Sequence, residues 1–153
     1  MPLYGYRSKF DNAMRLVAKV VGLAILVSPK AFAHDLANAT QAVGALSATL
    51  LDRFKAKDAA GIAALYTDSG VIVLPRITIV GRENLQHCWQ EMIESGRTNL
   101  HYTSDQIQTE GNTVVEMGHF SFRQGREVTG KFVNIYEWNG SDLKIRVHSF
   151  MLD

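Results

Sequence analysis

Residues 112–151 decide the fold, and they read NTVVEMGHFSFRQGREVTGKFVNIYEWNGSDLKIRVHSFM. Three runs rich in Val, Ile, Phe, Tyr and Trp are separated by two turn signals, Gln124-Gly125 and Asn139-Gly140-Ser141-Asp142. β-branched and aromatic residues favour strands, whereas Gly, Asn and Asp favour the turns between strands. The stretch therefore predicts three antiparallel strands in series.

The residues before this stretch predict helices and short strands that cover one face of the sheet. Apolar side chains recur at helical spacing in several segments, and Asp, Gly and Pro stand where these segments begin or end. The expected elements are a helix over 36–54, a short helix from Asp58 that carries Tyr66 and ends before Gly70, a hairpin of 71–74 with 77–80, a helix from Gly81 to Gly96, and a strand over 100–108. This order predicts one α+β domain.

Composition narrows the class of protein. The length of 153 residues suits one domain, with 46% hydrophobic and 20% charged residues as in ordinary globular proteins. Residues 1–33 hold five of the 16 basic residues but one of the 15 acidic residues, which leaves 11 basic and 14 acidic residues in 34–153. A mildly acidic body without a basic stripe argues against nucleic acid as a partner. Cys88 lies among apolar residues at helical spacing, which favours a buried small side chain over a reactive thiol.

The first 33 residues have the layout of an export signal. Arg15 and Lys19 precede an apolar run over 20–27, and Ala31-Phe32-Ala33 gives the small-x-small pattern of a cleavage site. Met14 is an alternative start of translation, and an N-terminal anchor or a core helix is the alternative interpretation. We expect a signal peptide over 1–33 and a mature domain over 34–153 that is periplasmic or secreted, with no membrane contact after cleavage. N-terminal sequencing of exported protein checks this expectation.

Three phrases of the sequence carry a resemblance to a known superfamily. AGIAALYTD at 60–68, VGRENL at 80–85 and GKFVNIY at 130–136 resemble, in order and spacing, phrases of the nuclear-transport-factor-two-like or SnoaL-like superfamily. The resemblance covers residues 40–151. It implies a cone-shaped, cystatin-like α+β fold, with a strongly curved mixed or antiparallel sheet packed on three N-terminal helices. The superfamily holds ketosteroid isomerase, polyketide cyclases, dehydratases, an epoxide hydrolase and a non-catalytic kinase association domain, so the fold does not fix the function.

The resemblance also implies a mostly apolar pocket between the sheet and the helices. Because side chains alternate along strands, residues two apart share a face. The expected inward sets are Val115, Met117, His119 and Ser121; Phe132, Asn134, Tyr136 and Trp138; and Val147, Ser149 and Met151, although a bulge would invert part of them. Tyr66, Leu74 and Trp89 are expected to add to the wall. His148 is expected to face solvent or a subunit contact, and Glu116 to point away from His119.

Ketosteroid isomerase chemistry is not expected, although His119 and Asn134 remain candidates for catalysis. The resemblance implies that the isomerase base falls at Leu74, the oxyanion Tyr near Leu50 and the oxyanion Asp at Asn134. Only Asn134 can still donate a hydrogen bond. His119 could act as a general base near neutral pH, but a hydrogen-bonded core histidine is the alternative. No common zinc or hydrolase motif occurs, and no metal or cofactor is expected.

The sequence therefore predicts a SnoaL-like domain of unassigned activity that binds a small apolar molecule. Its pocket would be lined by Tyr66, Leu74, Trp89, Met117, Tyr136 and Ser149. One alternative is a lyase, cyclase or isomerase that acts on a small apolar carbonyl compound through His119 and Asn134. The other is a non-catalytic dimerisation or assembly module. A homodimer is expected, because Val133 and Ile135 would leave an apolar patch on the outer face of the sheet.

Overall fold

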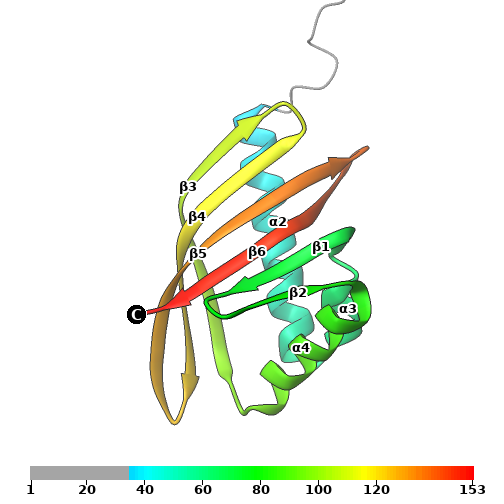
Figure 1. Cartoon of the computed structure of the whole chain (residues 1–153). Helices are drawn as coiled ribbons and strands as arrows, with labels where there is room; N and C mark the ends of the chain where they lie inside the picture. The colour runs from blue at the N-terminus through cyan, green and yellow to red at the C-terminus, as the bar shows by residue number, and fades with distance from the viewer. Residues whose placement is uncertain (1–34) are drawn as a thin grey trace, which may run out of the picture. The chain divides into compact units, whose positions relative to one another are not determined.

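The computed structural model describes residues 35–153 (Figure 1). The predicted signal peptide lies outside these residues. Residues 35–153 belong to one compact unit. Its elements in chain order are α2 (Leu36–Lys55), α3 (Ala59–Ala63), β1 (Tyr66–Leu74), β2 (Ile77–Val80), α4 (Arg82–Glu94), β3 (Thr98–Glu110), β4 (Thr113–Gln124), β5 (Arg126–Asn139) and β6 (Asp142–Leu152).

The strands form one open, mixed sheet of six strands in the order β2-β1-β6-β5-β4-β3. The last four strands in the chain are antiparallel neighbours, and β1 pairs with β6 in parallel. The helices lie against the sheet, with α2 running across the strands (Figure 1). The predicted α+β class and the antiparallel series over 112–151 are confirmed.

Side-chain caps mark where α2 and α3 begin. The Asp35 carboxylate accepts a hydrogen bond of 2.7 Å from the Asn38 amide at the start of α2. Asp58 caps α3 in the same way, through a bond of 2.8 Å from the Gly61 amide. Arg53 reaches the other Asp58 oxygen at 2.8 Å and ties the end of α2 to α3. Side-chain caps of this kind supply partners for amides that a helix leaves unpaired.

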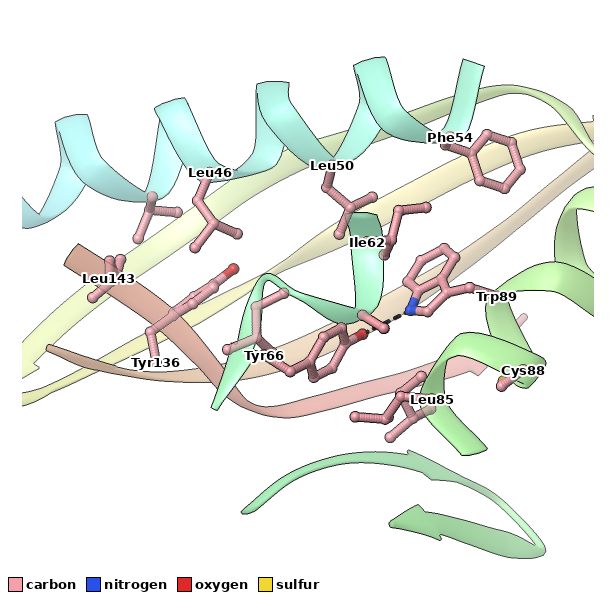
Figure 2. Packing of buried hydrophobic residues seen from close by; sticks show 14 of the residues in the cluster. Leu46, Leu50, Phe54, Ile62, Tyr66, Leu85, Cys88, Trp89, Tyr136 and Leu143 are labelled. Carbon is pink, nitrogen blue, oxygen red and sulfur yellow. Dashed lines mark hydrogen bonds between the residues drawn. The ribbon is translucent and has the colours of Figure 1, made fainter. Parts of the chain in front are cut away.

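The main core lies between the helices and the inner face of the sheet (Figure 2). The buried residues of α2 form one stripe. Near Leu46 this stripe faces Tyr136 and Leu143 of the sheet, and at Phe54 it faces Trp89 of α4 (Figure 2). Its members are Ala39, Val43, Leu46, Leu50 and Phe54. Trp89 of α4 packs edge-on against Phe54, with ring centroids 6.2 Å apart. This contact joins the end of α2 to α4 within the core.

The second helix is shorter than the sequence predicts. It ends at Ala63, and Tyr66 begins β1 instead of continuing the helix. The reason is long-range pairing, because the Ile145 amide of β6 donates a 3.0 Å hydrogen bond to the Leu65 carbonyl. Strand pairing therefore overrides the local helical spacing at this point.

The predicted inward face of β4 is wrong. Its inner residues are Val114, Glu116, Gly118, Phe120 and Phe122, and the expected set of Val115, Met117, His119 and Ser121 lies on the outer face. Both faces of this strand carry apolar residues, so apolar content alone does not fix the phase. A Cβ atom at Gly118 would collide with the backbone carbonyl oxygen of Thr103 and would lie 2.7 Å from the Phe132 ring, so this inner position needs a glycine.

The expected inner face of β5 is confirmed, whereas that of β6 is wrong. Phe132, Asn134, Tyr136 and Trp138 are buried as predicted. The pairing of β6 with β5 shifts by one residue: Tyr136 pairs with Ile145, but the neighbouring Ile135 pairs with Val147, so Arg146 has no partner in the register. The extra residue inverts the phase of the strand beyond it, which is the effect of a β-bulge. His148 and Phe150 therefore face inward, and the expectation that His148 faces solvent is also wrong, since it is 1% exposed.

Candidate functional site

A cavity of about 580 Å³ lies beside α4 and the inner face of the sheet. Aromatic and aliphatic side chains make up most of its wall, and the polar groups are few. The lining residues are Phe54, Leu74, Pro75, Cys88, Trp89, Glu91, Met92, Ser95, Arg97, Leu100, Tyr102, Phe120, Phe122, Phe150 and Leu152. Cys88 is buried as predicted, although it also borders this space.

A chain of four hydrogen-bonding side chains stands at the wall of the cavity. The Trp89 indole N–H donates to the Tyr66 hydroxyl oxygen at 3.0 Å (Figure 2). The same hydroxyl is 2.8 Å from His148 Nδ1, and His148 Nε2 is 3.4 Å from the Tyr102 hydroxyl. Trp89 and Tyr102 line the cavity, while Tyr66 and His148 are fully buried behind them.

Burial keeps the side chains of this hydrogen-bonded series uncharged. It lowers the pKa of His148 from its ordinary value of 6.5 to about 3, so the ring is neutral near pH 7. Burial also raises the pKa of the Tyr66 and Tyr102 hydroxyls, which therefore keep their protons. Trp89, Tyr66, His148 and Tyr102 thus form a network of uncharged side chains that are linked by hydrogen bonds.

A second buried polar cluster surrounds Glu116. The Tyr136 hydroxyl and the Ser104 hydroxyl donate short hydrogen bonds to the two carboxyl oxygens. The Asn134 side-chain nitrogen lies 3.0 Å from the Tyr136 hydroxyl and 3.4 Å from Glu116 Oε2. Burial, followed by the nearby Glu116, raises the pKa of Tyr136. Cross-strand pairing places Glu116, Asn134 and His148 in one row of the inner face.

The structure does not bring the two predicted catalytic residues together. His119 lies on the outer face of β4 with its side chain 55% exposed, and its Nδ1 is 3.1 Å from an Asp105 carboxylate oxygen. Asn134 is buried on the inner face, in the Glu116 cluster. As predicted, Glu116 points away from His119.

The six residues predicted to line the pocket are distributed over three environments. Leu74 and Trp89 line the cavity. Tyr66 and Tyr136 are buried in the two polar clusters, away from the cavity wall. Met117 and Ser149 are half-buried on the outer face of the sheet.

Sequence reasoning missed Tyr102, His148 and Glu116. A usable signal for the inner face of β4 is the pair Phe120 and Phe122, whose large rings need burial more than Ser121 does. If Phe120 and Phe122 face inward, then Glu116, which lies an even number of residues before them on the same strand, faces inward as well. No comparable signal marks the bulge before His148, because its cause is the pairing with β5.

The described part of the chain has neither a cluster of metal-ligating side chains nor a membrane-spanning helix. Within residues 35–153, no three His, Cys, Asp or Glu side chains are placed to hold a metal ion together. Over the same residues, none of the helices has the length and apolar character needed to cross a bilayer.

Several solved structures are similar to this chain. A protein of unknown function from Shewanella oneidensis, described as NTF-2 like, is 14% identical with a TM-score of 0.65, over 72% of this chain and 97% of that chain. A ketosteroid isomerase-like protein from Erwinia carotovora is 15% identical with a TM-score of 0.62, over 73% and 94% of the two chains. A domain of unknown function with a cystatin-like fold from Nostoc punctiforme is 11% identical with a TM-score of 0.66, over 78% and 80%. At these identities the similarity shows the fold alone.

Sequence comparison gives the family. None of the curated proteins matches the chain. The profile of the SnoaL-like domain matches residues 48–148, which include both polar clusters and most of the cavity wall. The predicted superfamily is thus confirmed, and the chain belongs to the SnoaL-like domain family.

Proposed function

We propose that this domain binds a small, largely apolar molecule in the cavity beside α4. The supporting observation is the cavity itself, whose volume of about 580 Å³ suits a small molecule. Its wall is built mainly from aromatic and aliphatic side chains, so a ligand would bury apolar surface. Burial of such surface contributes about 25 cal/mol per Å².

The few polar groups of the wall would orient the ligand. Tyr102 and Arg97 line the cavity, and the Arg97 guanidinium carbon lies 4.8 Å from the centroid of the Phe122 ring. Arg97 Nε is buried and has no hydrogen-bond partner within the described residues. Glu91 and Ser95 lie on the same wall. A ligand of low polarity with one or two oxygen atoms fits this combination.

Filling the cavity should weaken ligand binding by about tenfold or more. Leu100 is a half-buried wall residue, and Leu100→Trp would place a larger ring in the ligand's space. Excluding about 60 Å² of ligand surface costs about 1.5 kcal/mol, which is roughly a factor of ten in Kd. Equilibrium dialysis with methyl naphthyl ketone measures the effect.

The matched control is Leu36→Trp, because Leu36 is an exposed residue at the start of α2 and does not line the cavity. This variant should bind the ketone as tightly as the unmodified domain does. Equal binding by both tryptophan variants would refute the assignment of the cavity as the ligand site.

Among the described residues, the placement of His119 and Asn134 does not favour the catalytic alternative. A general base must reach the reacting proton, and these two side chains lie on opposite faces of the sheet. The ligand-binding proposal therefore needs neither residue. Export to the periplasm or the medium remains a prediction based on residues 1–33.

We also propose that the domain forms a homodimer through the outer face of its sheet. This face carries two adjacent cross-strand rows of half-buried, mostly apolar side chains. The rows are Val71, Val147, Ile135 and Val115, and Val73, Ser149, Val133 and Met117. The helices cover the other face (Figure 1), so a second copy is the natural cover for this patch.

Val133→Lys should convert the dimer into a folded monomer, because it would bury a charge on each side of the two-fold axis. Light scattering at micromolar concentration gives the mass, and circular dichroism checks the fold. Gln90→Lys, on the exposed face of α4, is the control and should remain dimeric. A monomer mass for the unmodified domain would exclude this proposal.

A further inference from the structure

We infer that the Tyr102 hydroxyl is held as a hydrogen-bond donor toward the cavity, so that the ligand carries a carbonyl oxygen where it meets Tyr102. This inference rests on the proposed function and specifies the chemistry of the ligand. Its basis is which group donates and which accepts in each hydrogen bond of the series Trp89, Tyr66, His148 and Tyr102.

The direction is set at Trp89, since an indole N–H can only donate. The Tyr66 oxygen therefore accepts at 3.0 Å, and the single Tyr66 proton is free to be donated elsewhere. The partner in reach is His148 Nδ1, at 2.8 Å. If Nδ1 carried the proton instead, the buried Tyr66 O–H would have no acceptor among its described partners. Leaving a buried donor unpaired costs about 1–3 kcal/mol, so His148 Nδ1 accepts.

The tautomer of His148 follows from this bond. The ring is neutral and has one proton, which must lie on Nε2 when Nδ1 accepts. Nε2 faces the Tyr102 oxygen at 3.4 Å, and it donates to that oxygen. The Tyr102 proton then points away from His148.

Among the described residues, His148 is the one hydrogen-bond partner of the Tyr102 hydroxyl; the Glu116 carboxylate lies near enough to help raise the pKa of Tyr102, but it makes no hydrogen bond with this hydroxyl. Phe132, Phe120 and His148 pack around the Tyr102 ring, with centroids 5.3, 6.3 and 6.0 Å away. Tyr102 lines the cavity, and the hydroxyl keeps its proton because burial raises its pKa. A neutral carbonyl group on an apolar body is the acceptor that suits this position, since an sp² oxygen accepts without bringing a competing donor.

A matched pair of probes tests the inference. Methyl naphthyl ketone and isopropenylnaphthalene have nearly the same shape but differ in having C=O or C=CH₂ at one position. The unmodified domain should bind the ketone about three- to tenfold more tightly, the range of one neutral hydrogen bond. Tyr102→Phe should remove this preference while it leaves binding of the alkene nearly unchanged.

Two spectroscopic measurements report the hydrogen bonds directly. In a carbon-13 isotope-edited infrared difference spectrum, the bound ketone's carbonyl stretch should lie at lower wavenumber in the unmodified domain than in Tyr102→Phe. Nitrogen-15 NMR of the unliganded domain should show the His148 proton on Nε2. A domain in which Tyr102 only supports the wall would give neither the carbonyl shift nor the ketone preference.

The outcomes separate the inference from the proposed function. Equal binding of ketone and alkene, an unchanged carbonyl stretch in Tyr102→Phe, or a His148 proton on Nδ1 would overturn the inference and leave the ligand-binding proposal standing. Failure of both probes to bind would overturn the two together. A ketone preference that disappears in Tyr102→Phe, with the expected stretch and tautomer, supports both.

Discussion

Acidification from about pH 6 to about pH 4 should lower the free energy of unfolding by roughly 2–3 kcal/mol through His148 alone. Burial lowers the pKa of His148 in the folded domain to about 3, against an ordinary value of 6.5. Between these values the unfolded chain binds a proton that the folded domain does not. The contribution of His148 to stability is therefore complete above about pH 6.5 and is lost as the pH falls toward 3.

Within residues 35–153, no charged side chain offsets the effect of burial on the pKa of His148. The groups that face it are aromatic or neutral, and they come from five elements. They are Tyr66 of β1, Trp89 of α4, Tyr102 of β3, Asn134 of β5 and Phe150 of β6. An imidazolium ion at this position would lack a counter-ion, which is why the folded domain favours the neutral ring.

Urea unfolding at a series of pH values measures this effect. Other acidic and basic groups also titrate, so the relevant quantity is the difference between the unmodified domain and His148→Gln. The unmodified domain should lose about 1.4 kcal/mol more per pH unit than the variant between about pH 6 and about pH 4. Parallel pH profiles for the two proteins would show that His148 is not held neutral by burial.

Tyr66→Phe should cost about 2–6 kcal/mol of the free energy of unfolding, although it removes a single oxygen atom. The substitution leaves the Trp89 N–H without its acceptor (Figure 2). It also leaves His148 Nδ1 without its donor. Both groups are buried, and each unpaired polar group costs about 1–3 kcal/mol. The phenyl ring keeps the shape of the side chain, so no large cavity contributes to the loss.

Tyr102→Phe is the matched control for this substitution. The Tyr102 hydroxyl has one described partner, His148 Nε2, at the longer distance of 3.4 Å. Its removal leaves one buried group, the His148 Nε2–H, without a partner, so it should cost about 1–3 kcal/mol, half of the loss expected for Tyr66→Phe. Denaturant unfolding of the two variants gives the comparison. Equal losses would contradict the account of the chain as a network organised around the Tyr66 oxygen.

Local sequence signals predicted those parts of the fold that depend on short-range chemistry. The turn at Gln124-Gly125 and the strand over 126–139 form as expected, because Gly favours the turn and Phe132, Tyr136 and Trp138 share one apolar face. The helix over 36–54 was also predictable, since its single buried stripe leaves one orientation. The second helix was predicted too long, because pairing of β1 with β6 decides the structure at Tyr66.

The site could be predicted only in part, because it depends on strand phase and register. Val115 and Met117 gave the outer face of β4 as much apolar character as the inner face, and this ambiguity led to His119 in place of Glu116. A shift in the pairing of β6 with β5 then turned His148 inward. Neither the shift nor the approach of Tyr102 to His148 leaves a mark in the local sequence, since both arise from contacts between distant segments.

The most direct test of the central claim is to locate a bound ligand within the domain. Nuclear Overhauser contacts between methyl naphthyl ketone and the isotope-labelled domain would give its position. The account predicts contacts from the naphthyl ring to Trp89, Leu100 and Phe150, which line the cavity. Contacts confined to outer-face residues such as Val133, or no contact with the cavity residues at saturating ketone, would contradict it.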